Sequence, residues 1–118
     1  MSEPEKSAAD CESLDEVRQQ IDRIDKGIVA LIAERSAYVL RAASFKKSHA
    51  DVPAPQRAEE VVRKAKGLAV ESGANPAVVE RVYREMIAAF IEAEMAEISA
   101  RPFGQRPSGD LSTAEENA

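Results

Sequence analysis

The sequence of 118 residues has one cysteine, no tryptophan, five glycines and six prolines, and only 4% of its residues are aromatic. A single cysteine, Cys11, excludes an intrachain disulfide framework and is compatible with a reducing compartment. So few glycines and aromatic residues disfavour a β-sandwich or a barrel. No stretch approaches the roughly 18 apolar residues of a membrane span, and the N-terminus has no signal-peptide core. These absences predict a cytoplasmic protein without a membrane segment.

The motifs of common catalytic and metal sites are also missing. The sequence has one histidine and lacks a nucleophile elbow, a phosphate-binding loop and a paired-cysteine motif. One histidine and one cysteine are too few for a histidine-based triad or a soft-metal site. The formal charge of -5 argues against nucleic-acid binding through the net field. We therefore expect no metal, no cofactor, and neither a nucleic acid nor a membrane as partner.

Helix-forming and apolar residues are abundant instead. Hydrophobic residues make up 44% of the chain and charged residues 31%, which suffices for a folded core. Residues 1–12 and 101–118 are rich in small and acidic residues and predict a mobile leader and a mobile tail. Residues 13–100 predict one all-α domain with three helices, one long, one short and one medium.

The long helix is predicted over residues 13–48. Ser13 and Glu16 have the spacing of a capping box at its start. Such a helix would be about 50 Å long, and the rest of so small a chain could not cover its apolar face. The uncovered face predicts an intertwined helical homodimer. Its apolar residues recur every three or four positions at Leu14, Val17, Ile21, Ile24, Ile28 and Leu31, and Val39 follows about two helical turns later.

Two shorter helices follow a turn-rich stretch at residues 49–54. The second helix is predicted between Pro55, which suits a helix start, and Gly73, which suits a helix end. The third helix is predicted to begin with Asn75 as its N-cap and Pro76 as its first residue, and to continue to the start of the tail.

The candidate functional residues are cations on or beside the long helix. The only basic excess along the chain lies within residues 13–48, with seven basic and five acidic residues. Arg35 and Lys46 are about three helical turns apart, so both could hold a small dianion. Arg18 lies about 25 Å from Arg35 along the helix and could serve only a partner chain's site. Taken singly, each cation could equally be a solvated surface charge.

Four segments together resemble the all-helical chorismate mutase family: LDEVRQQIDRID at 14–25, AER at 33–35, FK at 45–46 and PAPQR at 53–57. The resemblance covers about residues 10–98. The last two segments are most similar to the branch of isochorismate pyruvate lyases, which make salicylate and pyruvate. The resemblance implies an intertwined homodimer with two equivalent sites, acting in aromatic amino acid biosynthesis.

The resemblance also implies a role for each matching residue. Arg18 would be donated by the second protomer to a substrate carboxylate, and Arg35 would bind a carboxylate in its own protomer. Lys46 would contact a carboxylate and the ether oxygen, and Arg57 would close over the ligand from a loop. By the same resemblance, the apolar walls of the site would be lined by Val39 and Ile91.

The implied reaction is pericyclic, so it needs neither a nucleophile nor a metal. Chorismate must be held with its enolpyruvyl arm folded over the ring, and arginine–carboxylate pairs fix that pose. Negative charge then gathers on the ether oxygen, where Lys46 would act as a preorganised donor.

Two positions bear on the choice of substrate. Ala58 follows the loop arginine where many family mutases have an acid for the ring hydroxyl, which favours isochorismate. Glu94 stands where the bacterial branches have a glutamine beside the ether oxygen, and here it resembles the fungal mutases. A carboxylate would repel the forming charge, so we expect Glu94 to act protonated, with an acid-shifted activity profile. Alternatively, Glu94 is a surface residue beside Glu92 and Glu97.

The sequence thus predicts, first, a chorismate mutase that converts chorismate to prephenate without a cofactor. The alternative within the family is an isochorismate pyruvate lyase. An alternative of another class is a non-catalytic helical dimerisation module whose apolar stripe buries itself. In such a module, removing Lys46 would change no activity.

Overall fold

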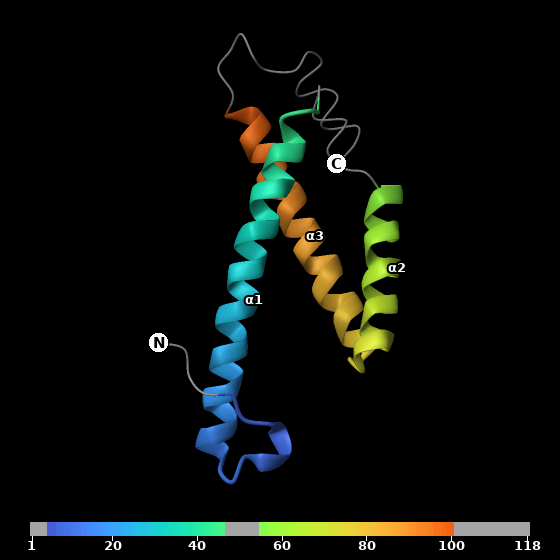
Figure 1. The fold of residues 1–118 in the computed structure, drawn as a ribbon. Coiled ribbons are helices and arrows are strands. Elements are labelled where there is room, and N and C mark those ends of the chain that lie inside the picture. The colour runs from blue at the N-terminus through green and yellow to red at the C-terminus, as the bar shows by residue number, and fades with distance from the viewer. Residues whose placement is uncertain (1–4, 47–54, 101–118) are drawn as a thin grey trace. The chain divides into compact units, whose positions relative to one another are not determined.

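The computed structural model describes residues 5–46 and 55–100 (Figure 1). Within these ranges the chain is all helical and contains no strand. The predicted order of a long, a short and a medium helix is confirmed there, with lengths of 30, 18 and 24 residues. The elements are a short 3-10 helix η1 (Ala8–Asp10) and the α-helices α1 (Leu14–Ala43), α2 (Pro55–Ser72) and α3 (Pro76–Ser99).

Some predicted segments lie outside the described residues. They are the tail at 101–118, the first four residues of the leader and the turn-rich stretch at 49–54. Across the ranges that are described, no helix combines the length and the apolar character that crossing a membrane requires.

The chain divides into two compact units, residues 1–38 and residues 39–118, and α1 contributes to both. In the first unit none of the described residues is buried. The apolar stripe of α1 is among the exposed positions; Ile21, for example, is 50% exposed. The first unit by itself therefore leaves this face uncovered.

The start of α1 has the predicted cap, with an additional contact. Ser13 Oγ accepts a hydrogen bond from the Glu16 amide at 3.1 Å, and Glu16 Oε2 accepts one from the Glu12 amide at 2.6 Å. Lys6 Nζ donates to Glu16 Oε1 at 3.0 Å. The Glu12 amide and then the Lys6 ammonium hold the pKa of Glu16 below its ordinary value.

The end of α1 corrects the predicted boundary, because the helix stops at Ala43 and not at residue 48. The Ser44 hydroxyl and amide both donate to the Arg41 carbonyl oxygen, at 2.6 and 3.1 Å. A continuing helix would use that oxygen for the Phe45 amide, which donates to Ala42 instead. A serine that competes for the helix carbonyls thus tightens the last turn.

In the second unit, α2 and α3 pack against each other and run in opposite directions from the turn that joins them (Figure 1). Gly73 has φ +77°, and the Ala74 amide donates to the Ala69 carbonyl at 2.8 Å, as in a Schellman helix end. Asn75 Oδ1 accepts from the Ala77 amide at 2.9 Å, which confirms the predicted N-cap of α3. Among the described residues of this unit, the buried apolar ones are Ala43, Val62, Ala65, Ala69 and Ile98.

The turn at Gly73 can be tested against a second glycine of the same helix pair. Gly73→Ala should lower the free energy of unfolding by about 1 kcal/mol, because an L-residue is strained at positive φ. Gly67 lies within α2, and an added Cβ there would meet open space. Gly67→Ala should therefore raise the free energy of unfolding by up to about 1 kcal/mol, because alanine favours the helix more than glycine does. Denaturant unfolding at fixed protein concentration measures both, and shifts of the same sign would contradict this account.

Candidate active site

Two of the predicted site residues, Lys46 and Glu94, are in direct contact. Lys46 follows the last turn of α1, and Glu94 lies near the end of α3. Lys46 Nζ donates to Glu94 Oε2 at 2.5 Å, although the two residues are 48 positions apart in the sequence. The Glu94 side chain is 8% exposed and that of Lys46 is 24% exposed. The pair is therefore an ion pair largely withdrawn from water.

Glu94 is the only buried polar or charged residue in the described part of the chain. It shares a face of α3 with Ile98, four residues on, which is fully buried. Glu92 and Glu97 are exposed, so Glu94 is not a member of a solvated acidic cluster. A buried carboxylate is unfavourable without a cation, and Lys46 supplies that cation.

The turn that presents Lys46 is held by contacts that sequence periodicity does not reveal. The Arg41 guanidinium lies 4.8 Å from the centre of the Phe45 ring, and Arg41 Nη1 donates to Ser44 Oγ at 3.3 Å. The Lys46 amide donates to the Ala43 carbonyl at 3.1 Å. These contacts fix the backbone directly before Lys46. Because Lys46 lies beyond the helix, the three-turn spacing assumed between it and Arg35 does not apply.

The other predicted residues are divided between the two units. Arg18 and Arg35 belong to the first unit, where Arg18 is exposed and Arg35 is half-buried with its Nη1 atom buried. The predicted wall residues Val39 and Ile91 belong to the second unit, and both are half-buried.

Arg57 lies in the first turn of α2 and not in a loop, which corrects the position implied by the resemblance, and its side chain is 64% exposed. Its Nη1 donates to Glu60 Oε1 at 2.5 Å, and Lys64 Nζ approaches the same oxygen at 3.3 Å. Lys64 and then Arg57 hold the pKa of Glu60 below its ordinary value. In this structure Arg57 is therefore paired with a carboxylate of its own helix.

The chemistry available at the site is that of fixed cations and one buried carboxyl group. Within the described residues, no cluster of three or more histidine, cysteine, aspartate or glutamate side chains is arranged to hold a metal ion. Arginines bind carboxylates through paired hydrogen bonds, and a shielded ammonium stabilises a developing oxyanion.

Comparison with known proteins agrees with this chemistry. Residues 17–95 match the family described as chorismate mutase type II. The chain is also 34% identical over 90 residues to a Pseudomonas aeruginosa protein named isochorismate pyruvate lyase, covering 76% of this chain and 89% of the relative. The helices and these matches together define an all-helical enzyme of the chorismate mutase class. The chain belongs to the chorismate mutase type II family, which confirms the predicted resemblance, including its likeness to the lyase branch.

The burial of Glu94 predicts how the ion pair affects stability. Lys46→Met should lower the free energy of unfolding by about 2 kcal/mol, because the Glu94 carboxylate stays buried without its cation. Adding Glu94→Leu should restore most of this loss, since apolar side chains of similar volume remove the buried charge.

Lys64→Met is the matched control, because Lys64 is a well-exposed lysine in a pair with Glu60. It should change the free energy of unfolding by less than about 0.5 kcal/mol. Denaturant unfolding of all four proteins makes the comparison. A double variant no more stable than Lys46→Met would show that the buried carboxylate is not the cause of the loss.

Proposed function

We propose that this protein is a cofactor-independent chorismate mutase that converts chorismate to prephenate. The observation that carries the proposal is the contact between Lys46 and the buried Glu94 at 2.5 Å, in a member of the chorismate mutase type II family. Family membership supports the substrate class. The pair supports the chemistry, because a shielded donor acts strongly on an oxygen that gains charge.

Lys46 is the residue that stabilises the ether oxygen. In the rearrangement the ether C–O bond breaks while a C–C bond forms, and electron density gathers on that oxygen. An ammonium group has three donors, so Lys46 can contact Glu94 and substrate oxygens at the same time. Glu94 pairs with Lys46 as a carboxylate in the free protein, and the proposed active form is the protonated acid, which would accept from Lys46 with one oxygen and donate its proton to the ether oxygen from the other.

The arginines bind the two carboxylates of the substrate and fix its folded pose. Arg35 and Arg57 act from the same protomer, and Arg18 is contributed by a second copy. The exposed apolar face of α1 supports that second copy, since residues such as Ile21 and Ile28 would otherwise stay half in water. We infer a homodimer in which each site combines residues of both chains.

Isochorismate pyruvate lyase is the second candidate function, and two observations favour it. The Pseudomonas aeruginosa relative, 34% identical over 90 residues, has that name. Ala58, directly after Arg57 on α2, offers no carboxylate to a substrate ring hydroxyl. Both reactions break the same ether bond, so Lys46 and Glu94 would have the same role in either one.

Turnover of both substrates tests the proposal. The purified protein should form prephenate from chorismate. Comparing its specificity constant for this reaction with that for salicylate formation from isochorismate ranks the two functions. Lys46→Ala should lower kcat/KM by roughly 100-fold or more, because the charge on the ether oxygen loses its donor. Lys64→Ala, an exposed control, should stay within about two-fold. A dimerisation module would turn over neither substrate, and a dominant yield of salicylate would favour the lyase.

Mixing of variants tests the shared site. Arg18→Ala and Lys46→Ala should each be inactive, but the two chains refolded together should recover about a quarter of the wild-type activity per chain. Half of the dimers are then mixed, and each mixed dimer has one site with both residues intact.

The control is a mixture of Arg35→Ala with Lys46→Ala. Both of these residues are assigned to the same protomer's site, so a mixed dimer has no intact site and no activity should return. Recovery in both mixtures, or in neither, would contradict the donation of Arg18 across the dimer.

A further inference from the structure

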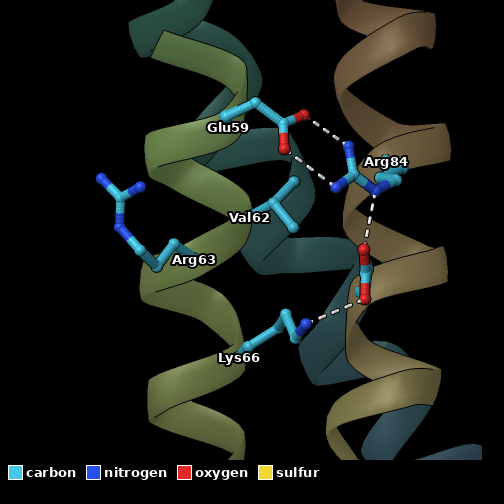
Figure 2. A pocket seen from close by; sticks show the side chains of 6 residues that line it. Glu59, Val62, Arg63, Lys66 and Arg84 are labelled. Atoms are coloured by element: carbon cyan, nitrogen blue, oxygen red, sulfur yellow. Dashed lines mark hydrogen bonds and ion pairs between the residues drawn. The ribbon is translucent and has the colours of Figure 1, made fainter. Parts of the chain in front are cut away.

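Away from the Lys46–Glu94 pair, four charged side chains form a cluster that crosses between α2 and α3 (Figure 2). Arg84 donates from Nη1 and Nη2 to the two carboxylate oxygens of Glu59, at 2.6 and 3.0 Å. Its Nε donates to Glu80 Oε2 at 2.9 Å, and Lys66 Nζ lies 3.1 Å from Glu80 Oε1. We call Glu59, Lys66, Glu80 and Arg84 the helix clip.

The clip is more than a set of separate surface pairs. Isolated exposed ion pairs contribute little to stability, but a bidentate arginine within a network has favourable geometry. The Arg84 hydrogen bond lowers the pKa of Glu59, and hydrogen bonds from Arg84 and then Lys66 lower that of Glu80. The clip therefore stabilises the fold above the ordinary carboxyl pKa of 4.5, and this contribution is lost as pH falls through the lowered values.

The clip ties the early turns of α2 to α3 where apolar packing is sparse. Val62, which is 3% exposed, lines the same pocket as the clip residues and lies on α2 between Glu59 and Lys66 (Figure 2). No described residue of α2 before Val62 is buried. The other buried residues of α2 are the small Ala65 and Ala69. Of the two ion pairs that join described residues of α2 and α3, the Arg84–Glu59 contact lies nearer to the first turn of α2.

We propose that Arg84 is a positioning residue for Arg57. Arg57 precedes Glu59 by two residues in α2, and Glu94 follows Arg84 in α3. By holding Glu59, Arg84 sets where the first turn of α2 lies on α3, and thus where Arg57 meets a substrate carboxylate relative to Glu94. This inference rests on the proposed function, in which Arg57 binds the ligand. Arg84 acts through Glu59 and is assigned no contact with the substrate.

Steady-state kinetics with Arg84→Ala tests this role. The KM for the preferred substrate should rise about five-fold, because Arg57 is less well placed, while kcat stays within about two-fold since Lys46 and Glu94 are unchanged. Glu59→Gln should have the same effect, and the double variant should be no worse than either single one. Arg84→Lys, which keeps the charge and loses the bidentate geometry, should lie between the wild type and Arg84→Ala.

Arg63→Ala is the matched control, because Arg63 lines the same pocket and points away from the clip (Figure 2). It makes none of the ion pairs found between described residues. If Arg84→Ala and Arg63→Ala have the same KM, the positioning role is wrong. A parallel loss of kcat and folded fraction with an unchanged KM would assign Arg84 a merely structural role and would equally overturn it.

Hydrogen exchange provides a readout that does not need turnover. Backbone amides of residues 59–64 should exchange faster in Arg84→Ala than in the wild type or in Arg63→Ala, because the early turns of α2 are released. If the wild-type protein turns over neither substrate, the proposed function fails, and this measurement alone decides whether Arg84 holds α2. Unchanged exchange would show that it does not.

Discussion

The contact between Lys46 and Glu94 is the interaction on which the candidate site depends. An almost fully buried carboxylate is stable only when a cation contacts it. Lys46, which follows α1, must therefore lie against the last turns of α3. The fully buried Ala43 and Ile98 belong to the same two regions and exclude water there. Two apolar side chains at these positions would stabilise the fold equally well. A buried ion pair, by contrast, supplies the water-shielded hydrogen-bond donor that the proposed reaction needs.

The position of Lys46 depends on where α1 ends. Ser44 donates to the Arg41 carbonyl oxygen that a longer helix would pair with the Phe45 amide. The Arg41 guanidinium in turn contacts the Ser44 hydroxyl and the Phe45 ring. One more helical turn would place Lys46 on the surface of α1 and direct it by helical periodicity alone. The short step from Ser44 to Lys46 is therefore part of the site: Lys46 was expected to act there, but the role of Ser44 in ending the helix was not.

The net charge of -5 says little about what an anionic ligand meets. Several acids on α2 and α3 are already committed to cations: Glu59 and Glu80 to Arg84, and Glu60 to Arg57 and Lys64. Their lowered pKa values express this pairing. The acidic excess is thus partly neutralised within the fold, and under the proposed function a few arginines and one lysine would set the field near a ligand.

The sequence by itself determined the three helices and the family. Apolar spacing, the capping residues Ser13 and Asn75, and Gly73 act over three or four residues, so their effect can be predicted locally. The resemblance identifies Glu94 as a candidate residue, but it predicts neither the burial of Glu94 nor its contact with Lys46. The early end of α1, that contact and the Arg84–Glu59 tie were decided by the tertiary structure. The two contacts join residues that are 48 and 25 positions apart, and the helix end depends on competing hydrogen bonds. Helical periodicity predicts neither kind of interaction.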